Sequence, residues 1–256
     1  MKFKFNFDKL YEKIKLHLIA EFNIFDDKLL RYIFVESHPK YREVNGMPYI
    51  DVLYKSVDKK GNSLTPIRIN ENKPTMTVLN DSDFSKANLY YGNLFGANQD
   101  AIDAVFTFIC HKEKFFSKRT ESIKGKEAGE FFRELNKLAV LDNKEKYFVY
   151  VFDLPMKNYY ERLMNSHSSH KFLEIIEGVP KDKVTVKSED FDTWSEEVLC
   201  TKYNNTPGYN CFYQKAFSLF RKYRFADFNY EIDTLYSNIL IDGRVDKYYI
   251  VIGKIK

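Results

Sequence analysis

The stretch 127-EAGEFFRELNKLAVL-141, followed at once by 146-KYFVYVFD-153, decides the fold class. An acidic start and apolar residues at Phe131, Leu135 and Leu138 give the first run the spacing of one helix face. The second run is short, apolar and aromatic, which is typical of a buried strand. A helix that leads directly into a buried strand is one step of an α/β sheet. We therefore expect an α/β fold, with α+β as the alternative, built on a central mixed β-sheet flanked by helices.

Apolar periodicity predicts further helices and strands around this unit. Residues 8–36 have helical spacing that breaks near 23–26, so they predict two helices. Residues 101–110 predict a buried strand. A helix is expected over 155–178, which opens with proline, closes with glycine and has room for an interruption at its serines. An amphipathic helix with a basic, aromatic face is expected over 211–228.

Four other segments predict strands, turns and loops. Residues 48–79 predict a β-hairpin or meander with a turn at 58-DKKGNS-63. Residues 111–126 are rich in lysine and predict an exposed loop or an edge strand. Short strands and turns alternate over 183–210, and a hairpin around an Asp-Gly turn is expected over 229–256.

The length and composition fit one domain over residues 1–256. At 256 residues, with 44% hydrophobic and 30% charged residues, the chain is long enough to bury a full core. We divide the domain into an N-terminal helical segment 8–36, a β-rich segment 48–79, an αβ core 100–178 and a C-terminal helix plus hairpin 211–256.

Several classes of protein do not fit this sequence. No apolar run approaches the roughly 18 residues that cross a bilayer, and the N-terminus lacks the apolar region of a secretory signal. We therefore expect a cytoplasmic protein without a membrane partner. Three cysteines without C-x-x-C spacing argue against disulfides and a zinc site. Phosphate-binding glycine motifs are absent, so we predict no nucleotide, haem or zinc cofactor.

The charge pattern favours a polyanionic partner. The formal net charge is +4, and two segments, 111-HKEKFFSKR-119 and 221-RKYRF-225, place cations beside aromatic rings. Such side chains can follow a phosphate backbone and stack on bases, although a solvated helix face has the same pattern. The candidate nucleic-acid-binding residues are Lys118, Arg119, Arg221, Lys222 and Arg224.

Asp51, Glu71 and Lys73 form the leading candidate for a catalytic site. An acid on one strand and an acidic-x-Lys triplet on the next resembles the restriction-endonuclease-like PD-(D/E)xK nuclease superfamily. This resemblance implies that Asp51 and Glu71 bind Mg²⁺, while Lys73 positions the attacking water. In a hairpin, a two-residue turn points Asp51 away from Glu71, whereas an odd loop or a bulge puts them on one face. The alternative is an ordinary solvated hairpin.

A second window resembles the same superfamily in its order of elements. Residues 100–155 predict strand, strand, helix, strand, with Asp103 in the first strand and 121-ESIK-124 in the second. Here Glu121 stands one place away from the position that an acidic-x-Lys triplet ending at Lys124 requires. The alternative catalytic residues of this window are Asp103, Glu121 and Lys124. Either its missing acid comes from Glu130 or Glu134 on the following helix, or this core has lost its metal.

A third pattern is Arg162-x4-His167. It resembles the R-x4-H pair of HEPN ribonucleases, which implies metal-independent RNA cleavage. That family is all-helical, whereas this chain is expected to contain strands. The alternative is that these residues form an ordinary polar helix end.

The sequence therefore predicts a Mg²⁺-dependent endonuclease of the restriction or antiviral-defence kind, with nucleic acid as its partner. The alternative is a non-enzymatic binding protein, such as an inhibitor or adaptor in a phage-defence or counter-defence system, with a protein partner. A HEPN-like ribonuclease is the third hypothesis.

Overall fold

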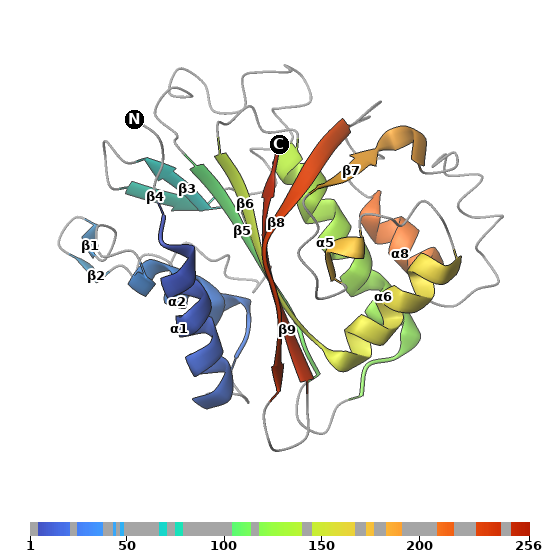
Figure 1. Cartoon of the computed structure of the whole chain (residues 1–256), viewed down its shortest axis with the longest axis horizontal. Coiled ribbons are helices and arrows are strands. Elements are labelled where there is room, and N and C mark those ends of the chain that lie inside the picture. Colours follow the sequence, from blue (N-terminus) through green and yellow to red (C-terminus); the bar gives the residue numbers. More distant parts are fainter. Residues whose placement is uncertain are drawn as a thin grey trace. The chain divides into compact units, whose positions relative to one another are not determined.

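The computed structural model describes residues 5–20, 25–37, 43–44, 47–48, 67–70, 75–78, 104–113, 118–139, 145–166, 173–176, 183–190, 209–217, 229–241 and 247–256. The chain divides into two compact units, Met1–Cys110 with Asp142–Tyr150, and His111–Leu141 with Val151–Lys256. One strand, β6 (Glu145–Asp153), has residues in both units, so this division does not test the prediction of a single domain. The fold is α/β, as predicted, with helices and a mixed sheet (Figure 1).

The described residues of the first unit form two helices and the strands that precede β6. In chain order they are α1 (Phe7–Ala20), α2 (Asp27–Ser37), β1 (Glu43–Val44), β2 (Met47–Pro48), β3 (Ile67–Asn70), β4 (Thr75–Val78) and β5 (Ala104–His111). The two helices confirm the prediction for residues 8–36. Each begins at a capping side chain: Asn6 Oδ1 accepts from Lys9 N at 2.9 Å, and Asp26 Oδ1 accepts from Leu29 N at 2.9 Å.

Strand β3 lies inside the sheet. In this unit the strand order is β4-β3-β5-β6, and β3 pairs antiparallel with β4 and with β5, with Ile67 opposite both Val78 and Phe106. Strands β3 and β4 thus confirm two of the strands predicted within 48–79. The hairpin expected between the strand that carries Asp51 and the strand at 67–70 is wrong over residues 67–69, because β4 and β5 take both sides of β3 there. The predicted turn at 58–63 lies outside the described residues.

Aromatic rings build the core of the first unit. The ring of Phe34 lies 4.9 Å from Phe5 and 4.6 Å from Phe106, and Phe106 in turn stacks on Tyr147 at 4.9 Å. Four successive residues of β5, 106–109, are buried. A strand covered on both faces reads as a continuous apolar run, which is why the sequence identified it.

Within its described residues, the second unit contains three α-helices, two short 3₁₀ helices and three strands besides the end of β6; one of the 3₁₀ helices covers residues 173–176. The others are α5 (Glu121–Ala139), α6 (Leu154–Ser166), β7 (Val184–Lys187), η4 (Ser188–Asp190), α8 (Tyr209–Ala216), β8 (Asn229–Ile241) and β9 (Lys247–Ile255). Their strand order is β6-β9-β8-β7. Strands β8 and β9 pair antiparallel from Ile232 opposite Ile255 to Ile241 opposite Lys247, which confirms the C-terminal hairpin. Its predicted Asp-Gly turn lies outside the described residues.

Helices α5 and α8 pack closely against each other (Figure 1). Phe132 on α5 lies 6.2 Å from the ring of Phe212 and 5.5 Å from that of Phe217. Beside it, a β-carbon at Gly129 would collide with the Phe212 carbonyl oxygen and would lie 2.9 Å from Lys215 Cβ. The absence of a side chain at Gly129 therefore allows the two helices to approach.

The structure corrects the predicted start of α5. This helix begins at Glu121 and not at 127, so the loop or edge strand predicted over 111–126 is wrong for its last six residues. Thr120 explains the earlier start, because its Oγ1 accepts from Ile123 N at 3.3 Å and its carbonyl oxygen accepts from Lys124 N at 3.0 Å.

Two other predicted helices are confirmed in their first parts. Helix α6 ends at Ser166, and residues 173–176 form a short 3₁₀ turn, while 167–172 lie outside the described residues. Helix α8 spans Tyr209–Ala216, and residues 218–228 of the predicted helix lie outside the described part of the chain.

Candidate functional site

The leading catalytic residues lie outside the part of the chain that the structure describes. These are Asp51, Glu71 and Lys73. The described strand nearest to them is β3, whose last residue, Asn70, immediately precedes Glu71.

The second window does not have the predicted arrangement of strands. Glu121 and Lys124 lie in the first turn of α5, where they form an ion pair at 2.5 Å, so the strand predicted for 121–124 is wrong. Asp103 lies outside the described residues. The two acids suggested as replacements, Glu130 and Glu134, both form ion pairs with Arg133 of this unit.

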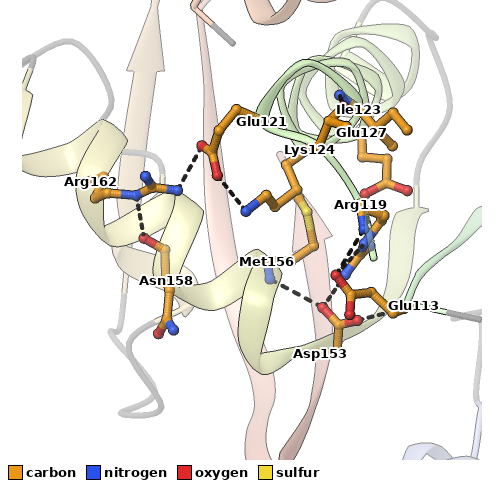
Figure 2. A network of polar contacts seen from close by, with 11 residues as sticks. Glu113, Arg119, Glu121, Ile123, Lys124, Glu127, Asp153, Met156, Asn158 and Arg162 are labelled. Atoms are coloured by element: carbon orange, nitrogen blue, oxygen red, sulfur yellow. Dashed lines mark hydrogen bonds and ion pairs between the residues drawn. The ribbon is translucent and has the colours of Figure 1, made fainter. Parts of the chain in front are cut away.

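Glu121 also joins α5 to α6. Arg162 Nη2 donates to Glu121 Oε2 at 2.7 Å, while Arg162 Nε donates to the Asn158 carbonyl oxygen at 3.4 Å (Figure 2). Burial by itself raises the pKa of Glu121, but hydrogen bonds and charge from Lys124 and Arg162 lower it overall. Arg162 is thus engaged by a carboxylate, and its R-x4-H partner His167 lies outside the described residues.

The predicted nucleic-acid contacts differ in exposure. Lys118 is exposed, whereas the side chain of Arg119 is only 7% exposed and faces carboxylates. A guanidinium buried among acids is not presented to a phosphate backbone, so this placement contradicts the role predicted for Arg119. The other three candidates, Arg221, Lys222 and Arg224, lie outside the described residues.

Arg119 is the centre of a polar cluster that the sequence analysis missed. Its Nη1 donates to Glu127 Oε2 at 2.7 Å, its Nη2 donates to Asp153 Oδ1, and its Nε lies 3.9 Å from Glu113 Oε1 (Figure 2). The backbone nitrogen of Arg119 also donates to Glu113 Oε1, at 3.0 Å. Three carboxylates from three segments of the chain therefore share one guanidinium.

Asp153 holds the cluster at the end of β6. Its Oδ2 accepts from Glu113 N at 2.6 Å, and its Oδ1 accepts from Met156 N at 3.1 Å, which caps α6. Since Glu113 follows directly after β5, these bonds bring the carboxyl ends of β5 and β6 together. That edge of an α/β sheet is where polar side chains collect.

A buried histidine and a half-buried acid lie beside the cluster. His111, the last residue of β5, has its Nε2 at 3.7 Å from Glu130 Oε2 on α5. Arg133 Nη2 lies 3.3 Å from Glu130 Oε1 and 3.0 Å from Glu134 Oε1. These contacts tie the middle of α5 to the end of the strand.

Two glutamates of α5 have opposite pKa shifts. Burial raises the pKa of Glu127, and the neighbouring Asp153 adds to this, so that the charges of His111 and Arg119 do not compensate. Burial also acts to raise the pKa of Glu130, but the hydrogen bond and charge of His111, with Lys215 and Arg133, lower it to about 2. Glu127 is therefore easier to protonate than an isolated glutamate, and Glu130 is harder to protonate.

The contacts of this cluster suit a structural role better than metal binding. Arg119 occupies the position between the carboxylates where a cation would lie. Across the described residues, no group of three or more His, Cys, Asp or Glu side chains has an arrangement suited to a metal ion. Nor does any described helix combine the length and apolar character of a membrane span.

Sequence signals for this cluster exist but are faint. Asp153 ends one apolar run that predicts a buried strand, and His111 comes directly after another. A polar residue at such a place points toward the carboxyl edge of the sheet. No local pattern identifies Arg119 as their partner, because it lies 34 residues from Asp153 in the chain.

Comparison with known proteins found no match among protein-family models, curated proteins or solved structures.

Proposed function

We propose that the protein is a Mg²⁺-dependent nuclease that cleaves phosphodiesters of nucleic acids in the cytoplasm, in a restriction or antiviral-defence role. Asp51 and Glu71 bind the metal, and Lys73 orients the attacking water. One observation supports the proposal: β3, held by β4 on one side and by β5 on the other, ends at the residue before Glu71, so that Asp51 would approach Glu71 beyond the end of β3 and not from a strand paired with it. A strand fixed by two neighbours is a rigid support for a catalytic triplet at its end.

The chemistry requires both acids. A phosphodiester in the transition state carries extra negative charge, which Mg²⁺ bound by two carboxylates stabilises. A Mg²⁺ ion held by Asp51 and Glu71 would supply a bound water of lowered pKa, and the Lys73 ammonium would help to orient that water. Loss of either acid removes the metal and with it most of the rate.

The cationic segments serve as the contact surface for nucleic acid in this proposal. Lys118 is exposed and belongs to one of them. Arg119 is excluded from the surface by its carboxylates, so the first segment contributes through its lysines. The second segment, residues 221–225, would contact nucleic acid through Arg221, Lys222 and Arg224.

Cleavage assays test the proposal. Plasmid DNA and RNA are incubated with the protein in Mg²⁺ or EDTA, with Asp51→Asn, Glu71→Gln and the control Asp142→Asn. The control removes the acid of another acidic-x-Lys triplet, Asp142-Asn143-Lys144. We expect cleavage in Mg²⁺ alone, reduced about 100-fold or more by the first two substitutions and unchanged by the control.

Other outcomes would favour one of the alternative functions. Cleavage that survives both substitutions would reject the site, and absence of cleavage on every substrate would favour the non-enzymatic inhibitor or adaptor. RNA cleavage that persists in EDTA and is lost in His167→Ala would indicate the HEPN-like ribonuclease.

A further inference from the structure

We draw no further inference here: the strongest candidate, the surface patch that the exposed side chains of Leu16 and Ile19 form on α1, supports no proposal, because nothing in the described part of the chain shows what covers it.

Discussion

Arg119 and Asp153 form a buried ion pair that connects the segment before α5 with the last residue of β6. The same carboxylate caps α6 and binds the backbone of Glu113. One side chain at the end of β6 thus organises the start of α6 and the segment that leads into α5. The stability of this unit should therefore depend strongly on Arg119, although the lysine-rich sequence around this residue predicts an exposed side chain.

Arg119→Met should destabilise the protein strongly. The substitution leaves Glu113, Glu127 and Asp153 together without their guanidinium, and removal of one partner of a buried ion pair costs about 3–5 kcal/mol. Urea unfolding measures the loss. Lys118→Met is the matched control, since Lys118 is adjacent but exposed, and its change should stay within about 0.5 kcal/mol. Equal losses in the two variants would contradict this account of the cluster.

Gly129→Ala should destabilise, although alanine normally favours a helix. The new β-carbon would collide with the Phe212 carbonyl oxygen and lie 3.0 Å from Ala216 N, so α8 has to move. Overpacking of this kind costs about 1–3 kcal/mol, which exceeds the roughly 0.5–1 kcal/mol gained in helix propensity. Denaturant unfolding measures the sign, with the exposed Lys126→Ala on the same helix as control. A gain in stability at Gly129 would show that the two helices are not in close contact.

Asn136→Leu should leave stability unchanged or raise it by about 1–2 kcal/mol. The Asn136 side chain on α5 is 1% exposed, and within the described part of the chain neither of its amide atoms has a hydrogen-bond partner. Leucine has a similar volume without the cost of burying an unpaired amide. Asn158→Leu on the exposed face of α6 is the control, with little expected effect. A clear loss of stability in Asn136→Leu alone would reveal a polar partner for this amide.

Apolar patterns predicted most of the fold that the structure describes. Leu10, Ile14 and Leu18 repeat at helical spacing and are buried on α1, and the run 147–152 is buried throughout β6. Such patterns record burial, which is the main reason that these elements form. The hairpin β8–β9 was predictable on the same grounds.

The start of α5 was missed because its first turn has no apolar stripe. Glu121, Lys124 and Lys126 give this turn the composition of a loop. The helix is instead started by the Thr120 cap and extended by the ion pair of Glu121 with Lys124. A capping residue is a local signal, and greater weight on Thr120 would have placed the boundary correctly.

The cluster was unpredictable for a different reason. Lys118 and Arg119 are neighbours with equivalent surroundings in the sequence, yet one is exposed and the other is buried. The two residues differ because Arg119 pairs with Asp153, which lies 34 residues further along the chain. Pairings over that distance depend on the sheet, so composition alone assigns both residues to the surface.

The central claim is that Asp51 and Glu71 jointly bind a divalent cation, and a Mn²⁺ titration followed by electron paramagnetic resonance tests it most directly. The protein, Asp51→Asn, Glu71→Gln and the control Asp142→Asn are compared at equal concentration. We predict that the protein and the control bind Mn²⁺ alike, and that each of the other two substitutions weakens binding by about 10- to 100-fold or more. Equal Mn²⁺ binding by all four proteins would contradict the claim.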